Sequence, residues 1–392
     1  MAWRSRRAAR LRGLVRVAPL AVGVVALVAF NVTAQNPVPG RTGVRHAEPG
    51  PGRDEVATPE EMPLPVGPVL GPWNRAWWTS VSSGAIDSTT LVAGGVAVPD
   101  GANVFAVRVV DGGPSPAYRF YQAGGGAFAT EFYPASSIKV LAALGALELA
   151  YASGFTGQAL VDGVYSLAEY YESAVRDSSN EDYDTLVRVA GVAWLNEQFL
   201  PSRGYDATRI QEAYAGGEGV TDSPPVHLAE EGREMVLPER SARSDYGCAA
   251  ANCSTLFELV DSVRRVMLDD EIPAEERFAI APTDVAGLQR ALSGAESWIG
   301  AGVVHALGPG ATLYSKPGWT SGYDCVDVGF VVAPESSGRY LIGVSAPDDG
   351  ECNMLAPLAA DVLSVLAGEV DGEALRSDGT LVPVVDGRQR PP

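Results

Sequence analysis

Strand-like and helix-like segments follow one another along this chain in an order that few folds accept. β-Branched and aromatic residues fill 103–110 and 117–123, and the intervening Asp111-Gly112-Gly113-Pro114 predicts a hairpin. An Ala/Leu-rich helix is predicted over 137–153, and helical patterns continue to about Ser293. Three further strands and a last helix are predicted at 311–315, 324–332, 339–344 and 354–366.

This order excludes a sheet built from alternating parallel βαβ units. Hairpins place neighbouring strands antiparallel, whereas parallel strands need a crossover between each pair. We therefore predict an α+β fold with one five-stranded antiparallel sheet, flanking helices, and an all-helical subdomain made from the insertion between the second and third strands.

The segments outside this region predict export. Six arginines precede an apolar run over 19–30, and Val32-Thr33-Ala34 offers small residues suited to signal-peptidase cleavage. Residues 1–34 are expected to be a signal peptide; counting the apolar run over 14–30 leaves an uncleaved membrane anchor as the alternative. The remaining predicted parts are a Pro-rich linker over 35–72, a folded domain over 73–367 whose Trp73, Trp77 and Trp78 mark a first helix, and a disordered tail over 368–392.

Charge and cysteine content restrict the partners. The net charge is −19, and without residues 1–34 it becomes (29 − 6) − 48 = −25, so nucleic acid is not expected as a partner. We expect a secreted or cell-envelope monomer. Cys248 and Cys253 are close in sequence, and a hairpin would bring Cys325 to Cys352, so two disulfides are hypothesised. The three histidines, His46, His227 and His305, show no ligand spacing with cysteine, and neither a metal nor a cofactor is expected.

The chain contains only two lysines, Lys139 and Lys316. Arginine stays protonated in proteins, whereas a buried lysine can lose its proton and act as a base. Lys139 follows Ser136 by three residues, which on a helix share one face, so the amine is predicted to come within reach of the hydroxyl. Ser136 at the helix start would also have backbone N–H groups available for an oxyanion.

Two further motifs accompany this pair. Asp177-Ser178-Ser179-Asn180 lies between helical segments, and Ser315-Lys316-Pro317-Gly318-Trp319-Thr320 follows a strand signal. The order Ser-x-x-Lys, Ser-x-Asn, Lys-x-Gly resembles that of the serine β-lactamases, class A in particular, and of the penicillin-binding D,D-peptidases, over about 73–366. The resemblance implies their β-lactamase/transpeptidase-like fold.

The resemblance also implies roles. Ser136 would be the nucleophile, Lys139 its proton acceptor, and Ser178 a relay to the leaving nitrogen. Asn180 would bind a substrate amide and Lys316 would supply a positive field. Gly318, Trp319 and Thr320 would line the substrate site, with the N–H groups of Ser136 and Trp319 as the oxyanion hole. Ser178 and Asn180 could instead only cap the following helix.

The sequence departs from the family at two places. Pro317 stands where a hydroxyl residue is usual, and Thr320 or Ser321 could compensate. The nearest match to the class A Glu-x-x-Leu-Asn loop is Glu234-Met235-Val236-Leu237-Pro238, with proline in place of the asparagine, so Glu234 is either the residue that positions the deacylating water or a solvated loop acid.

The leading hypothesis is an exported serine hydrolase that forms and hydrolyses an acyl-enzyme on a β-lactam or a related cell-wall amide. The alternatives are a D,D-peptidase, an esterase-like enzyme, and a catalytically poor relative that binds the cell wall. A Ser-His-Asp hydrolase is disfavoured because the chain lacks a Gly-x-Ser-x-Gly elbow.

Overall fold

The computed structural model describes residues 86–111, 115–128, 132–215, 222–248, 252–334, 338–368, 372–376 and 381–384. The predicted signal peptide or anchor, the linker and the helix containing Trp73 lie outside the described residues.

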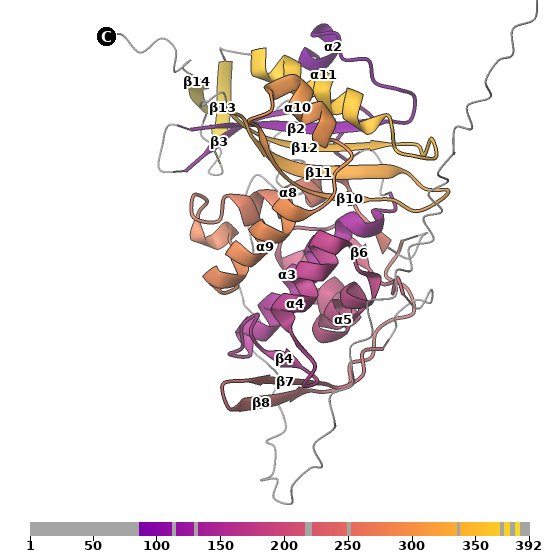
Figure 1. Cartoon of the computed structure of the whole chain (residues 1–392), viewed down its shortest axis with the longest axis vertical. Coiled ribbons are helices and arrows are strands. Elements are labelled where there is room, and N and C mark those ends of the chain that lie inside the picture. The colour runs from indigo at the N-terminus through magenta and orange to yellow at the C-terminus, as the bar shows by residue number, and fades with distance from the viewer. Residues whose placement is uncertain are drawn as a thin grey trace, which may run out of the picture. The chain divides into compact units, whose positions relative to one another are not determined.

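One sheet forms the centre of the described structure (Figure 1). Five of its strands are antiparallel neighbours in the order β10-β11-β12-β2-β3, which confirms the predicted five-stranded sheet. Their bounds are β2 (Asn103–Val110), β3 (Ala117–Gly124), β10 (Thr312–Gly318), β11 (Cys325–Val332) and β12 (Arg339–Ala346). The hairpin β2–β3 has the predicted position because its residues and its turn agree.

The sheet extends further than predicted on the β3 side. β1 (Ile86–Asp87) pairs parallel with β3, β13 (Gly372–Arg376) pairs antiparallel with β3, and β14 (Leu381–Val384) pairs with β13. The tail predicted to be disordered therefore contains two strands. Its polar composition concealed them, because strand pairing on an existing sheet edge needs only backbone groups.

Helices cover both faces of the sheet (Figure 1). The outer face carries α2 (Thr90–Ala93), α10 (Gly300–Leu307) and α11 (Leu355–Gly368). The opposite face meets a larger helical part with its own apolar core. Its helices are α3 (Lys139–Ala152), α4 (Leu167–Glu172), α5 (Asn180–Ala190), α6 (Val192–Trp194), α7 (Leu200–Ser202), α8 (Leu256–Met267) and α9 (Pro282–Gly294), with the short turns η2 (Ala135–Ile138), η3 (Ser173–Asp177), η4 (Leu195–Phe199) and η5 (Ala274–Glu276).

This larger part is not all-helical, contrary to the prediction. It contains a four-stranded sheet in the order β5-β4-β7-β8 and a two-stranded one, β6-β9. The strands are β4 (Leu160–Val161), β5 (Tyr165–Ser166), β6 (Arg209–Ile210), β7 (Val226–Glu230), β8 (Arg233–Leu237) and β9 (Asn252–Cys253). Four of these strands have only two residues, which is too few for a periodic signal in the sequence. The longer strands β7 and β8 are joined by a turn at Glu231-Gly232, where both residues have positive φ.

The helix α3 runs through the middle of the helical part. Together with η2 it is apolar enough to span a bilayer, with a mean hydropathy of 1.3, but 83% of Ala135–Ala152 is buried inside the protein. It is therefore a core helix, and its N-terminal end points toward the sheet beside β10 (Figure 1).

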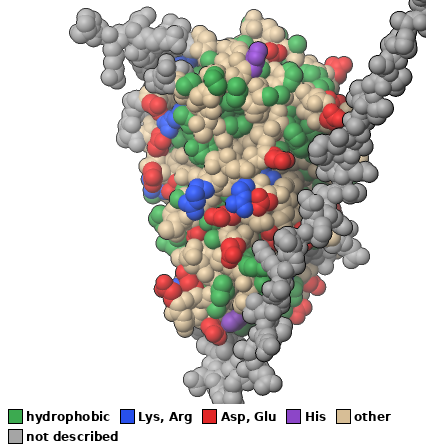
Figure 2. Space-filling model, in the orientation of Figure 1, with side chains coloured by type: hydrophobic (Ala, Val, Ile, Leu, Met, Phe, Trp, Pro, Cys, Tyr) green, Lys and Arg blue, Asp and Glu red, His purple; other side chains and the backbone are tan. Residues whose placement is uncertain are grey.

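Charged groups lie both on the surface and inside. Acidic side chains are spread over the face drawn in Figure 2, and basic ones gather in a short band at mid-height. Inside, Arg264 and Arg265 on α8 are fully buried and share the carboxylate of Asp261, at 2.8 and 2.7 Å. Arg264 also pairs with Glu276 at 2.8 Å. These buried guanidinium groups are matched by carboxylates.

Candidate active site

Ser136 lies in the short turn η2 that leads into α3, and its side chain is half-buried. The preceding Ala135 has φ +44°, a left-handed conformation that costs a residue with a Cβ about 1 kcal/mol or more. On the other side, a Cβ built on Gly318 would lie 2.2 Å from Pro134 O and 2.8 Å from Ser137 N. The lack of a side chain at Gly318 thus lets β10 pack directly against the turn that carries Ser136.

Lys139 is fully buried at the first position of α3. Its Nζ donates to Ser178 O at 2.6 Å and to Asn180 Oδ1 at 2.6 Å, and it lies 3.5 Å from Ser178 Oγ. Among the described residues, no hydrogen bond joins Lys139 Nζ to Ser136 Oγ. Ser178 and Asn180 of the second motif therefore meet around the Lys139 amine of the first, with Ser136 one helical turn earlier on the same segment as Lys139.

The backbone explains why Ser178 and Asn180 face this amine. The π-helical turn η3 ends at Asp177 and is followed by Ser178, whose φ of +58° reverses the chain direction. The next residue, Ser179, caps α5 by accepting from Asp182 N at 3.2 Å. Because Ser179 makes the cap, the capping role considered for Ser178 and Asn180 is not the one they have.

Lys316 completes the group from the edge strand β10. Its Nζ donates to Ser178 Oγ at 2.9 Å, and the residue is 1% exposed. The strand was predicted to end at Ser315, yet its pairing with β11 continues through Gly318. Pro317 is tolerated there because β10 lies at the edge of the sheet, where one side of the strand makes no ladder hydrogen bonds.

Both amines have lowered pKa values. Burial lowers the pKa of Lys139 well below its usual value, the charge of Lys316 lowers it further, and Asp184 is the first of three acids that act in the opposite direction. Burial lowers the pKa of Lys316 to about 8. The ion pairs of the described residues involve arginines and one histidine but neither lysine. The stronger lowering at Lys139 favours its neutral form beside a Lys316 that keeps its proton to a higher pH.

A group of tyrosines surrounds the amine and was not predicted. The Lys139 nitrogen lies 5.6 Å from the ring centroid of Tyr214 and 5.9 Å from that of Tyr183, and these two rings stack at 4.5 Å. Tyr214 Oη donates to Ala135 O at 2.8 Å. The rings shield the amine from water, which is one source of its desolvation. Tyr183, three residues after Asn180, could have been found by its helical spacing; Tyr214 lies in an irregular loop and gave no signal.

Glu212 is a second residue that the sequence did not reveal. Its Oε2 accepts from Tyr133 Oη at 2.8 Å, and Tyr133 precedes Ser136 by three residues. Its peptide oxygen accepts from Tyr183 Oη at 3.1 Å, and its peptide nitrogen donates to Asn252 Oδ1 at 3.1 Å. Burial raises the pKa of the Glu212 carboxyl. These bonds hold a half-buried carboxylate next to the segment that carries the serine.

The loop after β10 holds the other predicted substrate residues. Trp319 is 40% exposed and Thr320 is half-buried. Tyr323 in the same loop lies against Tyr133, with ring centroids 4.6 Å apart. The predicted residues Gly318, Trp319 and Thr320 thus border the Ser136 turn.

Glu234 lies elsewhere, and its position contradicts the predicted catalytic role. It is on β8, its side chain is 71% exposed, and its carboxylate lies 3.4 Å from His227 Nε2. The neighbouring Arg233 donates to Gly154 O, just beyond the last residue of α3. Lys139 is at the opposite end of this 14-residue helix, so about 20 Å separate the two places.

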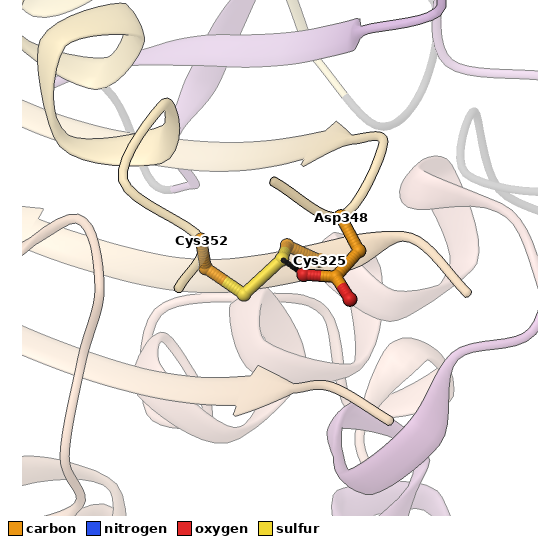
Figure 3. Close-up of side chains that lie close together, drawn as sticks. All are labelled: Cys325, Asp348 and Cys352. Atoms are coloured by element: carbon orange, nitrogen blue, oxygen red, sulfur yellow. Dashed lines mark hydrogen bonds between the residues drawn. A yellow bond between two sulfur atoms is a disulfide. The ribbon is translucent and has the colours of Figure 1, made fainter. Parts of the chain in front are cut away.

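Both hypothesised disulfides are present: Cys248–Cys253 and Cys325–Cys352, with Cα atoms 5.9 and 5.5 Å apart. Figure 3 shows that the Asp348 carboxylate points toward the second pair, 3.8 Å from Cys325 Sγ. The three side chains are close enough together to suggest a metal site, but both sulfurs are bonded to each other and offer no thiolate. The cluster is a covalent link between the start of β11 and the loop after β12.

Comparisons with known proteins give matches only among solved structures, since no family model and no curated protein matches the chain. The chain is similar to a β-lactamase from Burkholderia vietnamiensis (16% identity, 71% of this chain and 94% of that chain, TM-score 0.49). It is also similar to a class A β-lactamase from Bacteroides cellulosilyticus (16%, 69% and 94%, TM-score 0.46) and to a mutant of PBP-A in an acyl-enzyme complex with penicillin G (16%, 68% and 89%, TM-score 0.46). These likenesses concern the fold, and the roles of residues are inferred from this chain's own contacts.

Proposed function

We propose that this protein is an exported serine hydrolase that forms an acyl-enzyme through Ser136 on a β-lactam or a related cell-wall amide. The observation that carries the proposal is the hydrogen-bonded series Lys139–Ser178–Lys316, in which burial and the charge of Lys316 lower the pKa of the Lys139 amine. A neutral amine is the base that a serine hydroxyl needs. The two disulfides support an oxidising, extracytoplasmic location.

The acylation step uses these groups in a defined order. Ser136 Oγ bonds to the carbonyl carbon of the substrate while its proton passes to Lys139 Nζ. The carbon–nitrogen bond then breaks, and the leaving nitrogen receives a proton through Ser178 Oγ. The N–H groups of Ser136 and Trp319 would bind the oxyanion, and Lys316 would attract a substrate carboxylate. Asn180 is exposed as well as bonded to Lys139, so its amide can also reach the substrate.

Deacylation decides whether the enzyme behaves as a β-lactamase or as a penicillin-binding peptidase. With Glu234 excluded by its position, we propose Glu212 as the carboxylate that positions the water, supported by its raised pKa and its bond to Tyr133. One observation favours the peptidase: within the described part of the chain neither lysine forms an ion pair with an acid, so no carboxylate there contacts the Lys139 amine. A slow second step would then leave a long-lived acyl-enzyme.

The test is covalent labelling with a fluorescent penicillin and turnover of a chromogenic cephalosporin. We expect the wild-type protein to be labelled and Ser136→Ala to be inert. Ser137→Ala is the matched control, because Ser137 is the adjacent serine but its hydroxyl donates to Pro134 O at 2.7 Å and is fully buried. Loss of labelling in Ser137→Ala alone, or labelling of Ser136→Ala, would contradict the proposal.

The same assay separates the two outcomes of deacylation. If Glu212 positions the water, Glu212→Gln prolongs the lifetime of the label about 100-fold, within the range for loss of a general base. If the label is already long-lived in the wild type and Glu212→Gln changes nothing, the D,D-peptidase alternative is favoured. An unlabelled wild-type protein would leave the esterase-like and cell-wall-binding alternatives.

A further inference from the structure

Asp327 is a buried acid that the proposed reaction does not use. It lies on β11 opposite Pro317, the residue after Lys316, and is fully buried. Its Oδ2 accepts from Ser297 Oγ, Trp298 N and Ile299 N at 2.8, 2.8 and 3.2 Å, immediately before α10. Its Oδ1 is buried and has no hydrogen-bond partner among the described residues. A carboxylate oxygen left in this state is costly, so a compensating interaction is expected.

The sheet places this acid directly behind the Lys316 strand. Paired residues of an antiparallel ladder point to the same face. Lys316 pairs with Val328, whose side chain belongs to the core of the helical part, whereas Asp327 faces the residues that lead into α10. The two side chains thus leave adjacent strands on opposite faces, with the backbone of the sheet between them.

Other charged groups near Lys316 are less able to influence it. Lys139, from α3, is the other buried amine, and it opposes the charge of Lys316 only when it is itself protonated. Asp177, at the end of η3, is 53% exposed and already paired with Arg176, and Glu296, before α10, is exposed. Exposed charges are screened by water and salt, whereas a charge inside the sheet is not. Asp327 is therefore the buried acid among the carboxylates that favour the Lys316 ammonium.

We propose that Asp327 is a positioning residue that keeps Lys316 protonated, and thereby sets the upper pH limit of acylation, through the sheet and without touching the substrate. Burial raises the pKa of Asp327 to about 6, and the pKa of Lys316 is about 8, so both are charged between these values. Above about pH 8 the ammonium is lost, and with it the field that attracts a substrate carboxylate. The kinetic part of this inference rests on the proposed function; the titration part does not.

The lysine content makes a direct test possible. With only two lysines, protein labelled with ¹³C at the lysine ε-carbon gives two side-chain NMR signals, which can be followed against pH without any substrate. In Asp327→Asn we expect the Lys316 signal to titrate about one pH unit lower than in the wild type, because the variant removes one buried negative charge from the adjacent strand. The Lys139 signal should move less. In Lys316→Arg only one lysine signal is left, and this signal belongs to Lys139.

Ser297→Ala is the matched control. It removes one hydrogen bond to Asp327 Oδ2 but keeps the carboxylate and its two backbone donors, Trp298 N and Ile299 N. We expect the Lys316 titration of this variant to coincide with that of the wild type. An unchanged titration in folded Asp327→Asn, or an equal shift in Ser297→Ala, overturns the proposal. If Asp327→Asn does not fold, Asp327→Ser, which is neutral and keeps a small acceptor, carries the same expectation.

The kinetic arm measures the rate of labelling by fluorescent penicillin against pH. The fall in rate at high pH should move down in Asp327→Asn by the same amount as the Lys316 titration and stay in place in Ser297→Ala. A shifted titration with no labelling in any form would disprove the proposed function and leave the coupling between Asp327 and Lys316 intact. A shifted titration with an unshifted rate profile would disprove the role of Asp327 in acylation.

Discussion

The two lysines near Ser136 and the two arginines of α8 are all basic side chains removed from water, but the groups around them differ in kind. Arg264 and Arg265 share Asp261 at 2.8 and 2.7 Å, and Arg264 also reaches Glu276. The lysines have no ion-pair partner among the described residues and donate instead to hydroxyl, amide and carbonyl oxygens. The chain can build buried ion pairs, yet in its described part it builds none around its lysines.

The difference follows from the chemistry of the two side chains. A guanidinium cannot lose its proton in a protein, so a buried arginine requires acids. An amine can respond to burial by releasing its proton, which is what makes it a base. Matched charges stabilise one region, while in the proposed reaction the unmatched Lys139 amine of the other accepts a proton.

The largest effect on this comparison is expected when an arginine replaces Lys139, the proposed general base. Lys139→Arg replaces the amine with a permanent cation that cannot accept the Ser136 proton, and we expect the rate of labelling by fluorescent penicillin to fall at least about 1,000-fold. Thermal unfolding shows whether the variant is folded. Labelling at the wild-type rate would mean that another group takes the proton.

The reverse perturbation removes an acid from the arginine cluster. Asp261→Asn leaves two buried guanidinium groups without their shared carboxylate, and we expect the free energy of unfolding to fall by about 3–5 kcal/mol, measured by urea denaturation. Labelling per folded molecule should not change. Glu275→Gln, one residue from the buried Glu276 but exposed, is the control and should have the stability of the wild type.

A third test concerns an acid buried without a cation. Glu258 is fully buried, accepts from Ala207 N at 2.9 Å and from Thr208 Oγ1, and burial raises its pKa from 4.5 to about 7. Since the folded-state pKa is the higher one, stability is present below about pH 4.5 and is lost as the pH rises to about 7. Glu258→Gln should therefore gain about 3 kcal/mol relative to the wild type between about pH 4 and pH 8. A pH-independent difference in unfolding free energy would contradict this.

The smallest effect is expected at Glu234. Its carboxylate is exposed and far from Lys139, so Glu234→Gln should leave the labelling rate and the lifetime of the label at their wild-type values. The unfolding free energy should stay within about 0.5 kcal/mol of that of the wild type. A prolonged label lifetime would return Glu234 to the site and displace Glu212.

Much of the fold could be predicted because local signals agreed with it. The hairpin β2–β3 combines strand-forming residues with a turn, and α11 is a continuous apolar helix. The two-residue strands of the helical part carry no such signal, since their pairing depends on partners distant in sequence. β13 and β14 were missed for the same reason: the edge of β3 exists only once the sheet has formed.

Motif spacing identified the part of the site that lies on regular elements. Ser136 and Lys139 share one helical segment, and Ser178 and Asn180 flank Ser179, the residue that caps α5. Glu212 and Tyr214 belong to a loop that Asn252 on β9 holds in place by accepting from its peptide nitrogens, next to the Cys248–Cys253 disulfide. Such a loop has no periodicity. Glu234 was wrongly matched to the class A Glu-x-x-Leu-Asn loop because Glu-x-x-Leu also occurs on the strand β8.

The burial of both lysines has a practical consequence for handling the protein. Lys139 and Lys316 are 0% and 1% exposed in the native state. Reagents that couple to primary amines, such as succinimidyl ester dyes, biotinylation reagents and amine-reactive resins, therefore have little access to the lysine side chains of the folded protein. Conjugation at these positions then reports unfolding, and the numerous surface carboxylates are the better points of attachment for immobilising active material.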